Sequence, residues 1–297
     1  MSRLPRAFTI AQAREEGVDA RRLRSDRTWS RPYRGMRADA DASWFDVISA
    51  RVRAVGPDAV VFGPSALSVW GVERPGLAAP DPDLHVAVPR PGRAPRGAGI
   101  VGYSIGLEPI HVTNWRGVPV TTRPRTWIDL ARWLAVPQLV AVADQFCRLD
   151  ENWCTLSELS TALRAAPRVR GAARLREALE LVVPGAESYP ESLLRVMLEQ
   201  AGLPRAAVNA SIRGSGGFVA RVDLLFEDYG VIVEYEGAHH AEDKRQWRRD
   251  LTRIGELQRL GYIVERAHAG DLRDPSGLIE RVRIHLLRRG WKPAASR

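Results

Sequence analysis

Lysine is nearly absent from this chain. Lys244 and Lys292 are its only lysines, so arginine supplies almost all of the 44 basic residues. Against 35 acidic residues this gives a formal net charge of +9 and a sequence pI of about 10.3. Such a charge favours a polyanionic partner, in particular DNA. The abundance of arginine and alanine is also typical of a GC-rich genome, which raises arginine without regard to function.

Cysteine and long apolar runs are scarce as well. Cys147 and Cys154 alone support neither a disulfide framework nor a cysteine-based zinc site, and we expect both to be small buried residues. No apolar run reaches the length of a membrane helix, and the N-terminus lacks the apolar core of a signal peptide. The sequence therefore predicts a cytoplasmic chain with no membrane partner. It leaves the oligomeric state open.

The first 40 residues predict a small helical unit with a wing. Helices are expected at residues 11–16 and 20–26, followed by a short β-wing at residues 29–37. This is the geometry of a helix-turn-helix, in which one helix enters a DNA groove and basic flanks meet phosphates. The alternative is a solvated basic helix. The candidate DNA-contacting residues are Arg21, Arg22, Arg24, Arg27, Arg31 and Arg34, with Arg37 beside them.

Residues 41–182 predict a mixed α/β region that ends in a helical connector. We expect helices at 43–54 and 64–70, strands at 59–62 and 84–88, and a mobile loop at 89–99. A strand at 118–120 is followed by a turn and a helix within 121–131, and connector helices between 155 and 181 are interrupted near residue 167. No catalytic constellation is visible in this region. The isolated His85 and His111 are interpreted as structural histidines.

Residues 183–297 predict an α/β domain, because helical and strand patterns alternate along them. The expected order is a helix at 190–202, a β-hairpin, a helix at 242–260, a strand at 262–267 and a helix at 275–289. The whole chain is therefore expected to combine α+β and α/β architecture in three parts, 1–40, 41–182 and 183–297.

The predicted hairpin brings two acidic residues together. Its strands are expected at 221–226 and 231–237, joined by a four-residue turn. If they pair directly across that turn, Asp223 lies opposite Glu234. Opposed like charges destabilise a sheet, so a cation between them is expected. Mg²⁺ (or Mn²⁺) prefers such oxygen ligands and can activate water for phosphodiester hydrolysis. The alternative is an ordinary surface pair.

Glu236 lies two residues beyond Glu234 on the same face of the strand. It is a candidate third ligand or base. The alternative is an ion pair with Arg221, its expected cross-strand neighbour.

The C-terminal part resembles a domain-of-unknown-function family related to the very-short-patch-repair endonucleases of the PD-(D/E)xK superfamily. The resemblance covers about 110 residues in the expected order. It is carried by Pro190–Leu194, Arg221–Asp223, Val233–Gly237, His239–His240, Asp250–Arg253 and Gly261–Arg266. It implies a restriction-endonuclease-like α/β domain with an acidic, metal-dependent site.

The same resemblance implies roles for further residues. It makes Glu191 a third metal ligand, although Ser188 and Glu191 also fit a helix capping box. It makes His239 or His240 a general base or a group that orients water; the alternative is a pair of loop histidines. The superfamily lysine two residues after the second acid is replaced here by Glu236.

The helix at 242–260 could supply the missing positive charge. An apolar stripe is expected to face the sheet, with basic residues on the remaining surface. The candidates to stabilise phosphate charge are Lys244, Arg245, Arg248, Arg249 and Arg253. The alternative is a solvated basic face on which Asp250 pairs with Arg253.

The N-terminal half resembles the AbiEi-type antitoxins of type IV toxin–antitoxin systems, which begin with a winged helix-turn-helix. The matching segments are Phe8–Met36, Val60–Leu67 and Val118–Leu130. This resemblance implies DNA contact and a cognate toxin or operon partner. The sequence thus favours a metal-dependent endonuclease acting in defence or repair. The alternative is a non-catalytic DNA-binding regulator or antitoxin with a degenerate nuclease fold.

Overall fold

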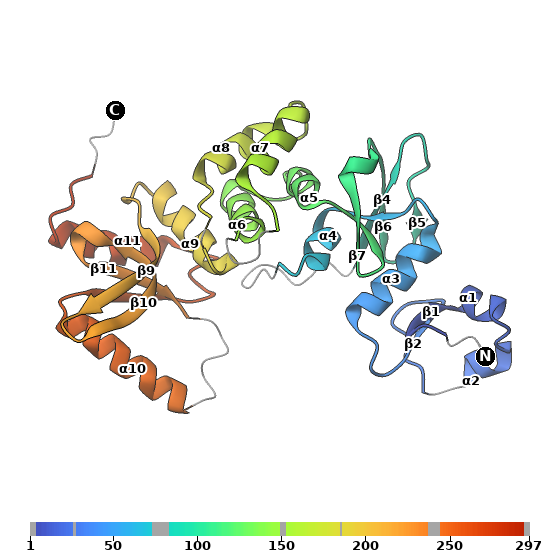
Figure 1. The fold of residues 1–297 in the computed structure, drawn as a ribbon, viewed down its shortest axis with the longest axis horizontal. Helices are drawn as coiled ribbons and strands as arrows, with labels where there is room; N and C mark the ends of the chain where they lie inside the picture. The colour runs from blue at the N-terminus through green and yellow to red at the C-terminus, as the bar shows by residue number, and fades with distance from the viewer. Residues whose placement is uncertain are drawn as a thin grey trace. The chain divides into compact units, whose positions relative to one another are not determined.

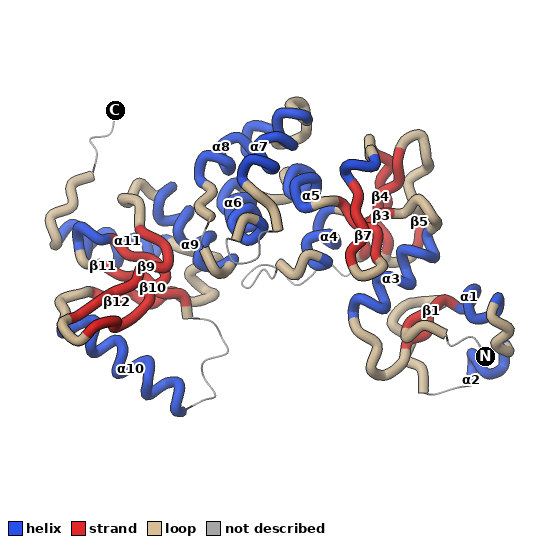
Figure 2. The backbone as a smooth tube through the Cα atoms, in the orientation of Figure 1, coloured by secondary structure: helices blue, strands red, loops and turns tan. Residues whose placement is uncertain are grey.

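The computed structural model describes residues 4–25, 28–72, 83–148, 153–184, 186–236 and 244–293, and within them all side chains except those of residues 24–25 and 244–251. The described chain forms two compact units. The first runs to Gly71 and from residue 83 to Leu130; the second holds Val72 and the chain from Ala131 onward. Helices and sheets occur in both, which confirms a mixed α and β protein (Figures 1 and 2). None of the described helices is long and apolar enough to cross a membrane.

Of the four N-terminal elements, the two helices are close to those predicted, whereas the first strand was not expected. They are β1 (Ala7–Thr9), α1 (Ile10–Glu15), α2 (Ala20–Ser25) and β2 (Met36–Ala38). Asp19 caps α2, because its carboxylate accepts the backbone N–H groups of Arg21 and Arg22. The predicted wing is present only in part: Ser30 bridges Ala38, while β2 pairs antiparallel with β1.

A six-stranded mixed sheet, in the order β5-β6-β4-β3-β8-β7, forms the centre of the first unit. The elements are α3 (Trp44–Val55), β3 (Val60–Val61), α4 (Gly63–Val69), β4 (Leu84–Pro89), β5 (Arg96–Gly97), β6 (Ile100–Ile105), β7 (Val112–Trp115), β8 (Val118–Thr121) and α5 (Arg123–Leu130). His85 is buried and its Nδ1 lies 3.1 Å from the Tyr103 hydroxyl, as expected for a structural histidine.

Four helices open the second unit: α6 (Val136–Phe146), α7 (Leu156–Ala165), α8 (Ala172–Leu181) and α9 (Tyr189–Gln200). The predicted break in the connector near residue 167 is confirmed, whereas α6 was not predicted. A buried ion pair joins α6 to α9, with Arg195 Nη2 3.0 Å from Asp144 Oδ2. Cys147 and Cys154 are both buried, as expected.

A four-stranded sheet, in the order β12-β11-β10-β9, completes the second unit. Its elements are β9 (Ala207–Gly214), β10 (Gly217–Phe226), β11 (Val231–Tyr235), α10 (Lys244–Arg259), β12 (Ile263–Ala267) and α11 (Ser276–Arg288). The strands β11 and β12 are parallel, so α10 serves as the crossover between them. Figure 1 shows α10 on one side of this sheet and α11 on the other. Leu257 of α10 packs into the apolar cluster built on the sheet, as the predicted stripe requires.

Candidate acidic site

The predicted hairpin register is confirmed. Phe226 pairs with Val231 and Leu224 with Val233, so the next position along the ladder sets Asp223 beside Glu234. The tight return between β10 and β11 uses Gly230 at φ +61°, in the left-handed region that glycine adopts without strain. The two carboxylates therefore come from adjacent strands of one sheet.

Asp223 is the most strongly perturbed of these acids. Its pKa is raised to about 7, mainly by burial and also by the negative charges of Glu191 and Glu234. The N–H of Tyr235 donates to Asp223 Oδ2 over 2.8 Å, and this bond together with the Arg253 charge acts in the opposite direction. Three carboxylates thus act on one another near one end of β10, a pattern common at functional sites.

Glu234 is held by an arginine from the crossover helix. Arg253 Nη1 lies 2.5 Å from Glu234 Oε1 and Nη2 lies 3.0 Å from Oε2, which is a two-pronged ion pair. Glu234 is 8% exposed. The expected alternative pairing of Arg253 was with Asp250, whose side chain lies outside the described set, and the contact with Glu234 was not foreseen.

Glu191 both caps a helix and faces the acidic cluster. Its Oε1 accepts the Ser188 hydroxyl over 2.6 Å and its Oε2 accepts the Glu187 N–H over 3.2 Å. The Ser188 hydroxyl in turn accepts the Glu191 N–H at the start of α9, so Ser188 is the predicted N-cap, whereas the Glu191 carboxylate accepts the Glu187 N–H in place of the Ser188 N–H of a full capping box. Its charge also contributes to the raised pKa of Asp223. The cap and the electrostatic role are therefore compatible.

Asn209 is a member of the cluster that the sequence did not reveal. The pairs Val222–Ala210 and Leu224–Val208 flank it, so the ladder sets Asn209 beside Asp223 on the opposite side from Glu234. Its backbone has φ +52°, and its Nδ2 lies 3.4 Å from Glu191 Oε2. Asn209 lies in a strand that mixes small, apolar and polar residues, and this strand carries no pattern that could have identified it.

The expected pairing of Arg221 with Glu236 is wrong. Glu236 Oε1 lies 2.5 Å from Arg266 Nη2, and Arg221 pairs with Glu187. The reason is topological: the parallel partner β12 places Arg266 next to the end of β11, whereas the residues before α9 reach Arg221. Glu236 is exposed, and its ion pair leaves it outside the group that shifts the pKa of Asp223.

The donor chemistry of Asp223, Glu191 and Glu234 suits a hard divalent cation, because all three offer carboxylate oxygens. Within the described part of the chain, no three histidine, cysteine, aspartate or glutamate side chains are gathered closely enough to hold an ion as they stand. Arg253 occupies both oxygens of Glu234. A cation at this place would therefore compete with a guanidinium.

Several predicted site residues, or their side chains, lie outside the described part of the structure. His239 and His240 lie outside the described residues. Arg249 belongs to α10, but its side chain is not described, and the same holds for Lys244, Arg245 and Arg248.

The candidate DNA-contacting arginines divide into three groups. Arg21 and Arg22 on α2, and Arg31 and Arg34 in the segment before β2, are exposed. Arg24 lies on α2 with its side chain undescribed, and Arg27 lies outside the described residues. Arg37 is unsuited to phosphate contact, because it is 6% exposed and donates to the carbonyls of Leu23 and Met36.

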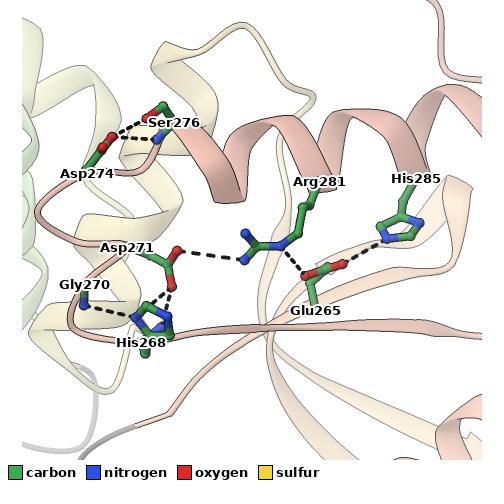
Figure 3. A network of polar contacts seen from close by, with 8 residues as sticks. All are labelled: Glu265, His268, Gly270, Asp271, Asp274, Ser276, Arg281 and His285. Atoms are coloured by element: carbon green, nitrogen blue, oxygen red, sulfur yellow. Dashed lines mark hydrogen bonds and ion pairs between the residues drawn. The ribbon is translucent and has the colours of Figure 1, made fainter.

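A second polar network lies between β12 and α11 (Figure 3). Glu265 accepts Arg281 Nε over 3.1 Å and lies 2.9 Å from His285 Nε2. Asp271 accepts the His268 N–H over 2.9 Å and lies 3.8 Å from Arg281 Nη2. Both acids already contact cationic or N–H partners. We therefore interpret the network as structural, since its contacts hold α11 against the sheet.

Comparisons with known proteins identify similar proteins, but none whose description states an activity. No family model matches this sequence. Two proteins described only as uncharacterized, MT2308 of Mycobacterium tuberculosis strain CDC 1551 / Oshkosh and Rv2248 of strain ATCC 25618 / H37Rv, are each 28% identical over 233 residues, covering 78% of this chain and 83% of the relative. The crystal structure of the RV2827C protein from Mycobacterium tuberculosis aligns with a TM-score of 0.39 and 16% identity, over 71% of this chain and 84% of that one.

Proposed function

We propose that the second unit hydrolyses phosphodiester bonds of nucleic acid with the help of Mg²⁺ or Mn²⁺. The observation that carries this proposal is the raised pKa of Asp223, which sits partly buried within the field of Glu191 and Glu234. A carboxylate that is buried beside two like charges is costly to ionise unless a cation relieves the cost. The order of one helix, three antiparallel strands, a crossover helix and a parallel strand also agrees with the restriction-endonuclease-like domain that the sequence resemblance implies.

Each residue of the cluster has a defined task in this proposal. Asp223 and Glu191 would hold the ion, with Glu234 as the third oxygen ligand. The ion would supply Lewis acidity and lower the pKa of a bound water. Arg253, which lies at the same carboxylates, would stabilise negative charge on the phosphate in place of the lysine that Glu236 replaces.

The test is a cleavage assay of the full chain on single- and double-stranded DNA and on RNA, with Mg²⁺ or Mn²⁺. Asp223→Ala and Glu234→Ala are each expected to lower the cleavage rate by about 10³-fold or more, because each removes a ligand of the ion that activates water. Glu191→Gln keeps the oxygen that caps α9 and removes the charge, so a folded but inactive variant would identify Glu191 as a ligand.

The matched control is Asp228→Ala. Asp228 is exposed in the turn between the two site strands, and its replacement likewise removes one carboxylate. It should retain full activity. A wild-type chain that cleaves no nucleic acid with either metal would contradict the nuclease proposal.

A second candidate function is DNA binding without catalysis. It is favoured by Arg253, which already neutralises Glu234 without a metal ion. In this alternative, α1 and α2 with the β1–β2 sheet form a winged helix-turn-helix, and the chain acts as a regulator of the antitoxin type with a cognate toxin or operon partner.

The DNA surface can be tested through salt dependence. The exposed Arg21, Arg22 and Arg31 are changed together to alanine, and binding to duplex DNA is measured by fluorescence anisotropy from about 50 to 200 mM salt. Each lost phosphate contact is expected to flatten the slope of log K against log salt by about 0.9. The control changes three exposed arginines of the second unit, Arg164, Arg168 and Arg176. Equal flattening by both triple variants would show that only net charge matters.

A further inference from the structure

A pocket of about 570 Å³ lies in the first unit, between the N-terminal elements and the edge of the six-stranded sheet. Three segments build it. The first contributes Thr9 and the residues from Tyr33 to Met36, the second contributes α3, and the third is the β5–β6 hairpin. Its volume is within the range of small-molecule sites.

The lining is positively charged. Arg34, Arg51 and Arg96 come from the three different segments, and no acidic side chain is among the residues found to line the pocket. Arg34 and Arg96 are exposed, so both can turn toward a ligand at little cost. Three arginines that line one pocket favour a phosphate, because arginine matches phosphate oxygens with paired N–H groups.

Arg51 is the fixed member of this group. It is 4% exposed, its guanidinium stacks at 3.6 Å on the Tyr33 ring, and its Nη2 donates to the carbonyls of Ala98 and Gly99. Its Nη1 has no hydrogen-bond partner among the described residues. Burial lowers the pKa of Arg51, while Tyr33 and the charge of nearby Asp83 act in the opposite direction. A buried N–H without an acceptor is costly, and a bound anion would supply the acceptor once the guanidinium shifts toward the pocket, because Nη1 is enclosed as it stands.

The backbone at Gly99 leaves room for the Arg51 guanidinium. Gly99 has φ +67°, and a Cβ there would lie 2.8 Å from Arg51 Nη2. Any larger residue would push the guanidinium out of its place. Beside Thr9 and Tyr33, the wall includes the apolar side chains of Met36, Ala54, Val55 and Ile100. The pocket thus offers cations for an anionic group and an apolar surface for an uncharged ring.

From this combination we infer that the pocket binds a nucleoside phosphate. Its phosphates lie among Arg34, Arg51 and Arg96, and its base lies against the apolar wall. The ligand ties the segment before β2, which holds candidate DNA-contacting arginines, to the β5–β6 hairpin. Occupancy of the pocket thereby sets the position of the N-terminal elements within the first unit.

The experiment is isothermal titration calorimetry of the full chain with AMP, ADP, ATP, adenosine and inorganic phosphate. At least one nucleotide is expected to bind about tenfold or more tightly than adenosine or phosphate alone, because only the nucleotide uses both parts of the pocket. Arg34→Ala and Arg96→Ala, both at exposed positions, should each weaken nucleotide binding by about tenfold. Arg53→Ala is the matched control, since Arg53 is exposed on the same helix as Arg51 and does not line the pocket.

Three outcomes would overturn the inference: no heat of binding with any nucleotide at millimolar concentration, equal affinity for phosphate and nucleotide, or nucleotide binding that survives both Arg34→Ala and Arg96→Ala. Circular dichroism of each variant excludes loss of fold as the cause of lost binding. DNA affinity is also measured in the absence of nucleotide. If DNA binding is retained while nucleotide binding is absent, the nucleotide inference fails independently of the DNA-binding proposal.

Discussion

Replacing Asp223 by asparagine should raise the free energy of unfolding at pH 8 by about 4 kcal/mol, since a shift of one pKa unit corresponds to about 1.36 kcal/mol. The pKa of Asp223 rises from 3.8 to about 7 on folding, because the carboxylate is buried beside Glu191 and Glu234. Asparagine carries no charge, and its amide oxygen can still accept the Tyr235 N–H. The variant therefore removes the repulsion and keeps the hydrogen bond.

The stability gain of the Asp223→Asn variant should increase with pH. A raised pKa means that the folded state binds the proton more tightly than the unfolded chain does. The contribution of Asp223 to stability is therefore complete below about pH 3.8 and is lost as the pH rises through about 7. The advantage of the asparagine variant should fall to about 1.5 kcal/mol at pH 5.

Urea denaturation at pH 8 and pH 5 measures this difference. Asp228→Asn, in the exposed turn, is the control and should show little change at either pH. A gain for Asp223→Asn that is the same at both pH values would show that the aspartate is not perturbed. If the cluster binds a cation, Mn²⁺ should stabilise the wild type at pH 8 and the asparagine variant much less.

Changing Arg195 to methionine should destabilise the second unit by about 3–5 kcal/mol, the usual cost of leaving one partner of a buried ion pair alone. Arg195 is 2% exposed and Asp144 is fully buried. The guanidinium also donates to the Leu181 carbonyl over 2.9 Å and to Glu199 over 3.3 Å. Without it, Asp144 keeps the Val183 N–H, which donates over 2.8 Å, and the side chain of Ser192, which are too few partners for a buried charge.

The partner substitution shows whether charge is the cause. Asp144→Asn combined with Arg195→Met removes both charges and keeps an oxygen for the Val183 N–H. The double variant should therefore be more stable at pH 8 than Arg195→Met alone, when unfolding is measured by thermal or urea denaturation. Arg176→Met on the exposed face of α8 should change stability by less than about 0.5 kcal/mol. A double variant as unstable as the single one would indicate that lost packing outweighs the stranded charge.

Local patterns were sufficient for much of the fold. The apolar periodicity before Gly56 predicts α3, and the alternation from Leu84 predicts β4. The turn signal at Gly230 fixes the hairpin register, and with it the proximity of Asp223 and Glu234. These features depend on neighbours within a few residues, which a sequence displays directly.

The missed elements depend on distant partners. The strand β9 is made mostly of small or polar side chains and exists because β10 pairs with it. The strands β6 and β7 have half-buried, irregular patterns, and β6 is completed by parallel pairing with β4. Patterns within one segment cannot report such pairings.

The site was predicted in part for the same reason. The two acids of the hairpin follow from local register, whereas their electrostatic neighbours come from other segments. Arg253 reaches Glu234 from the crossover helix, and Arg266 reaches Glu236 through the parallel strand. Only the three-dimensional pairing of β11 with β12 selects these partners from the many arginines in the chain.

The backbone of Asn209 has a consequence for the behaviour of the protein at high concentration. The strand β9 ends the four-stranded sheet, and a free strand edge is a template on which a second copy of the chain can add its own strand. At φ +52° Asn209 interrupts the extended conformation in the first half of β9. The edge therefore offers two short stretches in place of one of eight residues, which makes fibril-like self-association through this strand less favourable.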